Sequence, residues 1–235
     1  MGRAFEYRKA TKLKRWANMS KTFTRIGKEI TMAVKEAGDN PRNNLRLRMA
    51  IQNAKAANMP KENVERAIKK ATSKDQADYK EVIYEGYAPH GIAVLIETAT
   101  DNHVRTVANI RSIFNKYGGS LGTQGSVDFM FERKCFIKIE KPDMDIDELE
   151  LELIDYGAEE VFADGDEVMI YGAFSDFGAL TAAVEERGLK VITTGFERVP
   201  MDLKELSDEE KAEVETVLEK LEEDDDVQYV FTNMK

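Results

Sequence analysis

The chain has 235 residues, of which 42% are hydrophobic and 33% are charged. This length allows one to three domains, and the apolar content is sufficient to form cores beneath a strongly charged surface. We expect no membrane-spanning helix, because no stretch approaches the roughly 18 consecutive apolar residues that one requires. We also expect no secretory signal, since the basic N-terminus lacks an apolar core segment. The single cysteine, Cys135, excludes a disulfide framework and favours the reducing cytosol.

The net charge of −10 conceals a strong asymmetry along the chain. Residues 1–75 contain 19 Lys and Arg against 7 Asp and Glu, a balance of +12. Residues 76–235 contain 15 against 37, a balance of −22. A basic segment joined to an acidic body is typical of proteins whose basic part binds a polyanion such as a nucleic acid.

The first 20 residues combine cations with aromatic side chains and show no clear apolar period. Phe5, Tyr7 and Trp16 stand among the cations Arg8, Lys9, Lys12, Lys14 and Arg15. We expect a largely mobile arm that contacts phosphates and offers its rings for stacking on bases. The alternative is a solvated tail whose Trp16 packs on the next helix.

Three amphipathic helices are predicted to follow, over residues 21–37, residues 43–57 and the residues after Pro60. Apolar faces predict a small bundle, and the opposite faces collect cations. Lys and Arg would also solubilise any helical surface, but Glu serves that purpose equally well and is scarce here. The sign of the charge therefore favours contact with nucleic acid or the ribosome. The candidate contacts are Lys21, Arg25, Lys28, Lys35, Arg48, Lys55, Arg66, Lys69 and Lys70.

From Tyr79 onward the pattern changes to short strands and helices. Strands are predicted at 81–88, 92–99 and 127–131, and a helix at 103–117. Residues 134–198 follow the order strand, helix, strand, strand, helix, strand, which is the ferredoxin-like or split βαβ arrangement. The sequence ends with a predicted helix at 207–222, opened by a capping box of Ser207 and Glu210, and a strand at 227–231.

This last helix and strand have no partners of their own, so we expect them to complete the sheet that begins at residue 81. Residues 79–133 and 199–235 would then form one discontinuous domain, with residues 134–198 inserted as another and residues 1–78 forming the basic arm and bundle. The predicted fold class is α+β: an N-terminal basic three-helix domain followed by two α/β domains.

No motif for catalysis, metal binding or small-molecule binding stands out. The glycine-rich stretch 118–125 would let a phosphate approach closely, but it follows a helix and lacks the Lys and Ser or Thr of a P-loop, so a plain turn is favoured. The aspartates of 143–147 lack the Gly and Glu that complete an EF-hand. His90 and His103 have no sequence-visible catalytic partner, so we expect neither an enzyme nor a cofactor.

Four stretches resemble the YebC/PmpR family, which includes mitochondrial translational activators of cytochrome oxidase. They are Lys55–Lys69 (KAANMPKENVERAIK), Tyr84–Gly91 (YEGYAPHG), Thr100–Ala108 (TDNHVRTVA) and Gly118–Ser126 (GGSLGTQGS). The AANMP and TDNxxRTV segments are the most specific, and the likeness runs from residue 21 to the C-terminus. The N-terminus departs from the family's usual MAGHSKW opening.

The resemblance implies two α/β domains of ferredoxin-like character after the helical domain, and no catalytic chemistry. It implies a cytosolic regulator of gene expression that binds nucleic acid, as a DNA-binding transcriptional regulator. The alternative within the family is a ribosome-associated translation factor that binds ribosomal RNA through the same basic domain. The expected partners are DNA, RNA or both, with no membrane, cofactor or small-molecule substrate.

Overall fold

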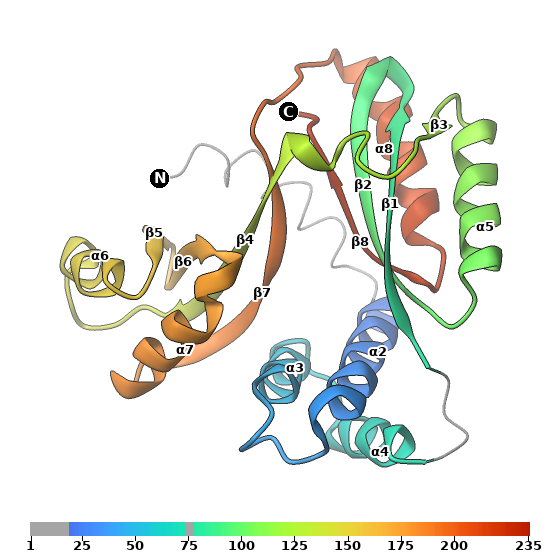
Figure 1. The fold of residues 1–235 in the computed structure, drawn as a ribbon. Coiled ribbons are helices and arrows are strands. Elements are labelled where there is room, and N and C mark those ends of the chain that lie inside the picture. Colours follow the sequence, from blue (N-terminus) through green and yellow to red (C-terminus); the bar gives the residue numbers. More distant parts are fainter. Residues whose placement is uncertain (1–18, 74–77) are drawn as a thin grey trace. The chain divides into compact units, whose positions relative to one another are not determined.

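The computed structural model of the protein describes residues 19–73 and 78–235. The chain forms two compact units. The first unit joins the N-terminal helices to Arg133–Glu197, and the second joins Lys74–Glu132, as far as it is described, to Arg198–Lys235. In the described part of the chain, three helices precede two sheets with their helices, which confirms the predicted α+β class (Figure 1). The boundaries of the three predicted domains stay a prediction.

The N-terminal bundle consists of α2 (Met19–Ala37), α3 (Leu45–Ala56) and α4 (Lys61–Ala71). Its core contains the apolar side chains that helical spacing places on one face of each helix, including Ile30 of α2 and Leu47 of α3. Burial of these faces, more than intrinsic helix propensity, stabilises helices as short as these.

Asn44 joins the end of α2 to the start of α3. Its Oδ1 accepts a hydrogen bond from the N–H of Leu47 at 2.9 Å, so α3 begins two residues later than predicted, with Asn44 as its N-cap. The Nδ2 of the same side chain donates to the carbonyl oxygens of Ala33 at 2.7 Å and Gly38 at 2.8 Å. Because Asn44 is buried, these bonds also satisfy polar groups that water does not reach.

The sheet of the first unit has the strand order β5-β6-β4-β7. Helix α6 connects β4 to β5, and α7 connects β6 to β7. In each connection a third strand lies between the two that the helix joins, which is the split βαβ arrangement predicted for this part of the sequence. The elements are β4 (Phe131–Glu140), α6 (Ile146–Ile154), β5 (Ala158–Asp164), β6 (Glu167–Ala173), α7 (Phe177–Glu186) and β7 (Val191–Pro200).

The sheet of the second unit has the order β3-β1-β2-β8, so the C-terminal strand pairs with β2. Helices α5 and α8 pack on one face of this sheet, where Phe114 of α5 and Leu218 of α8 join Ile96 of β2 in a common core. The predicted capping box opens α8. The elements are β1 (Lys80–Ala88), β2 (Ile92–Thr100), α5 (His103–Lys116), β3 (Ser120–Leu121), α8 (Asp208–Glu222) and β8 (Val227–Thr232).

The strand predicted at residues 127–131 is wrong for all but its last residue. Asp128–Met130 form a short 3-10 helix, and β4 begins at Phe131. The cause is Glu85 of β1, which is buried with 4% of its surface exposed. Its carboxylate accepts hydrogen bonds from the N–H groups of Gly125, Val127 and Asp128 at 2.6, 2.7 and 2.8 Å. Backbone donors that a strand would use therefore bond to a side chain.

Within residues 19–73 and 78–235, no helix is long and apolar enough to cross a lipid bilayer. In the same part of the chain, no group of three or more His, Cys, Asp and Glu side chains lies close enough to hold a metal ion.

Candidate nucleic-acid interface

Three of the exposed predicted contacts of the bundle lie on α4. Arg66, Lys69 and Lys70, here called the α4 cations, are exposed, and none of them forms an ion pair within residues 19–73 and 78–235. Lys69 and Lys70 occupy the last turn, where positive charge interacts favourably with the helix dipole. Because no carboxylate of the described chain forms an ion pair with the α4 cations, their positive charge is available to bind an anionic ligand.

The predicted cations of α2 are covered to different degrees. Lys35 is exposed, whereas Lys21 and Arg25 are half-buried. Lys28 is buried, with 8% of its surface exposed, although helical spacing places it on the face opposite the bundle core. Helical spacing gives the position of a residue only relative to its own helix. It cannot predict which side chains are covered by residues elsewhere in the chain. The burial of Lys28 leaves little of its side chain for a ligand, and its contact with nucleic acid stays a prediction.

The polar side chains of Arg48, Gln52 and Lys55, spaced along α3, differ in what they contact. The guanidinium of Arg48 forms an ion pair with Glu185 of α7 at 3.1 Å, and Gln52 donates a hydrogen bond to the carbonyl oxygen of Val191 at the start of β7. Lys55 is exposed and forms no ion pair in the described chain. The charge of Arg48 is therefore offset within the first unit, whereas that of Lys55 is not paired in the described residues, and both contacts stay predictions.

Asn53, the neighbour of Gln52, bonds to the same strand. Its Oδ1 accepts from the N–H of Thr194 at 2.9 Å and from the hydroxyl of Thr193 at 2.8 Å, and its Nδ2 donates to the carbonyl oxygen of Thr194 at 2.8 Å. No sequence signal links α3 to a strand so far along the chain. The predicted arm contacts, Arg8, Lys9, Lys12, Lys14 and Arg15, lie outside the described residues.

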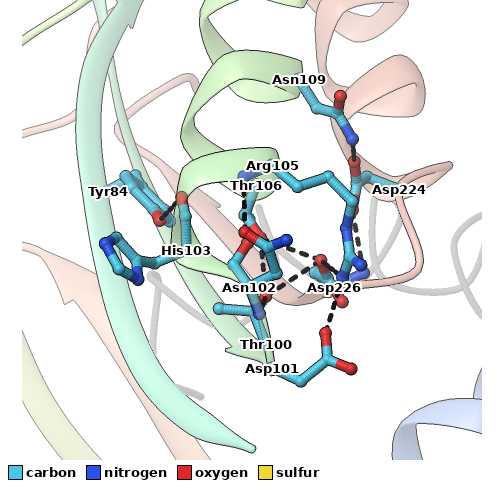
Figure 2. A network of polar contacts seen from close by, with 10 residues as sticks. All are labelled: Tyr84, Thr100, Asp101, Asn102, His103, Arg105, Thr106, Asn109, Asp224 and Asp226. Atoms are coloured by element: carbon cyan, nitrogen blue, oxygen red, sulfur yellow. Dashed lines mark hydrogen bonds and ion pairs between the residues drawn. The ribbon is translucent and has the colours of Figure 1, made fainter.

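A polar network in the second unit surrounds Asp226, which is buried and directly precedes β8 (Figure 2). Its Oδ2 accepts hydrogen bonds from Arg105 at 2.6 Å, from the Thr106 hydroxyl at 2.8 Å and from the Thr100 hydroxyl at 3.1 Å. Asn102 caps α5 by accepting from the N–H of Arg105 at 3.1 Å. The TDNxxRT segment therefore ties the end of β2 and the start of α5 to β8.

The charges of this network are offset by one another. Hydrogen bonds to Asp226 and then to Asp101 raise the pKa of Arg105 above its usual value. Burial, and then the charge of Asp226, raise the pKa of Tyr84, whose hydroxyl donates to the carbonyl oxygen of His103 at 3.3 Å. Because three donors already bond to Oδ2 of Asp226, the arrangement suits a structural role. The stretch that resembles the family includes Thr100, Arg105 and Thr106, but no sequence signal made Asp226 their partner.

Comparison with known proteins adds to this geometry. Residues 3–74 match the domain family described as "TACO1/YebC protein N-terminal domain", and residues 79–234 match "TACO1/YebC second and third domain". A relative from Flavobacterium johnsoniae, named "Probable transcriptional regulatory protein", is 63% identical over 235 residues, covering 100% of this chain and 99% of the relative. A relative of the same name from Parabacteroides distasonis is 58% identical over 236 residues, covering 100% and 97%.

A solved structure supports the same assignment. The crystal structure of a conserved hypothetical protein from Aquifex aeolicus superposes with a TM-score of 0.79 at 38% sequence identity, covering 93% of this chain and 91% of that one. Both domain families together span nearly the whole sequence. The chain therefore belongs to the TACO1/YebC family.

Proposed function

We propose that this chain is a DNA-binding transcriptional regulator of the cytosol, without catalytic activity, whose N-terminal bundle neutralises backbone phosphates. The observation that carries the proposal is the exposure of the α4 cations, none of which is ion-paired within the described residues. Lys55 and Lys35 are exposed on the neighbouring helices. The relatives named "Probable transcriptional regulatory protein" support a role in gene regulation.

Phosphate neutralisation has a measurable signature. Each cation that contacts a phosphate of duplex DNA displaces condensed counterions, so the logarithm of the binding constant falls with the logarithm of the salt concentration by about 0.9 per contact. We expect Lys69→Gln/Lys70→Gln to bind DNA more weakly and to reduce this slope by about 1.8, for two lost contacts.

The matched control is Lys141→Gln/Lys190→Gln, which makes the same charge change at two exposed lysines of the first unit outside the bundle. We expect its slope to equal that of the unsubstituted protein. A slope near zero for the unsubstituted protein on DNA would refute the proposal. Absence of DNA binding together with salt-dependent cosedimentation with ribosomes would also refute it, and would point to the translation factor that the sequence left open.

A further inference from the structure

The acidic part of the chain contains one long interval without any carboxylate. Residues 102–127 hold Arg105, Arg111 and Lys116 but no Asp or Glu. The remainder of the second unit, residues 74–101, 128–132 and 198–235, holds 7 Lys and Arg against 21 Asp and Glu. A polyanion approaching the second unit is repelled by most of its surface, so an interval of net charge +3 is where repulsion is smallest.

This interval forms one helix and the loop that follows it. Helix α5 turns Ile110 and Phe114 into the core and leaves Arg111, Asn115 and Lys116 exposed. After β3, Thr123 and Gln124 are also exposed. These five exposed polar residues are here called the α5–loop surface. Figure 1 shows β3 beside the C-terminal end of α5.

The carboxylates at the two ends of the interval are bonded to arginines. Asp101 pairs with Arg105 at 3.0 Å, and Asp128 pairs with Arg198 at 3.2 Å. On the side toward β8, Asn109 donates to Asp224 at 2.8 Å, which marks where the acid-free surface ends. The charges of Arg111 and Lys116 are therefore not offset by the carboxylates that border the interval in sequence.

Hydrogen bonds to Glu85 restrain the backbone of the loop. Glu85 accepts the N–H groups of Gly125, Val127 and Asp128, so a buried carboxylate fixes the backbone on both sides of Ser126. Gly125 has a φ of +84°, and a Cβ placed on it would meet no atom within 4 Å, so its position is open to an approaching molecule. A fixed backbone with a glycine at an open position allows close approach of another backbone.

We infer that the α5–loop surface is a second contact surface for the phosphate backbone of duplex DNA. Arg111 and Lys116 supply the charge, and Asn115, Thr123 and Gln124 supply neutral donors of the kind that bond phosphate oxygens and fix register. This inference rests on the proposed function, because it assigns additional contacts to the same ligand. It goes beyond that function by giving the acidic second unit a direct part in binding.

The test measures DNA affinity between 50 and 200 mM salt, roughly the range over which such contacts weaken. As the salt rises across this range, the affinity of every DNA-binding form falls by some factor. We expect this factor to be about tenfold smaller for Arg111→Gln/Lys116→Gln than for the unsubstituted protein, because two contacts are missing. The control, Lys211→Gln/Lys220→Gln, makes the same charge change on α8 of the same unit, whose first turn carries three carboxylates, and should leave the salt dependence unchanged.

A second variant keeps the test informative if the first one unfolds. Gln124→Glu places a carboxylate on an exposed loop position and should weaken DNA binding, whereas Glu219→Gln on α8 should not. If both surface variants bind as the unsubstituted protein does while Lys69→Gln/Lys70→Gln binds more weakly, the inference fails and the proposed function stands. If the unsubstituted protein shows no salt-dependent DNA binding, both fail.

Discussion

Replacement of Glu85 by Gln tests whether one buried carboxylate determines the conformation of the loop after β3. The Oε1 atom accepts from Gly125, and the Oε2 atom accepts from both Val127 and Asp128. A Gln side chain has only one acceptor oxygen, and its NH₂ group would face an N–H donor wherever it replaced the other oxygen. At least one of the three backbone donors therefore loses its partner.

The expected cost follows from the bonds that are lost. An unsatisfied buried donor costs about 1–3 kcal/mol, and bonds to a charged acceptor are worth about 1 kcal/mol more than bonds to a neutral one. We expect Glu85→Gln to lower the free energy of unfolding by about 2–4 kcal/mol. Urea denaturation of the two proteins at pH 7 measures this difference. Glu219→Gln, at an exposed position of α8, is the control and should change stability by less than about 0.5 kcal/mol.

The same variant predicts a pH dependence. Burial raises the pKa of Glu85, but the hydrogen bonds from Val127, Gly125 and Asp128 outweigh it, and the net effect lowers the pKa from the ordinary value of 4.5. A lowered pKa in the folded state stabilises the protein above the unfolded-state value, and this contribution disappears as the pH falls through the folded-state value. The stability difference between the two proteins should therefore shrink below pH 4.5. A difference under about 1 kcal/mol at pH 7, or one that grows with acid, would refute the reasoning.

Two further predictions concern other buried groups. Asp226→Asn removes the charge that holds Arg105, Thr100 and Thr106 together, and should destabilise the second unit toward urea by about 1–3 kcal/mol; an unchanged denaturation midpoint would contradict this structural role. Burial raises the pKa of Cys135 to about 11, so at pH 8 roughly one thiol in a thousand is ionised. Cys135 should therefore react with iodoacetamide much more slowly in the folded protein than in urea, and equal rates would show that the thiol is accessible.

The regular elements were predictable because their signals are local. Apolar spacing of 3.6 residues identified the bundle helices, since each of them has a face that must be buried. Alternation of strands and helices likewise predicted the split βαβ order of the first unit. Ser207 and Glu210 marked the start of α8 with side chains only three residues apart.

The remaining features depend on partners far along the chain. Glu85 accepts backbone hydrogen bonds around position 127, so a segment with alternating apolar residues forms a short 3-10 helix and not a strand. Arg48 looks like a free cation on its helix, and only the fold brings Glu185 to it. The candidate site was therefore predictable as a charge pattern, while the share of those charges left exposed was not.

The bonds between Asn53 and β7 have a consequence for solubility. Strand β7 is at the margin of its sheet, and such margins present unused donors and acceptors to which strands of other molecules can attach. At Thr194 both the N–H and the carbonyl are already bonded to the amide of Asn53, which mimics a neighbouring backbone. By bonding to these backbone groups, the helical bundle hinders the addition of a strand from another molecule. We therefore expect a truncated chain without the bundle to self-associate.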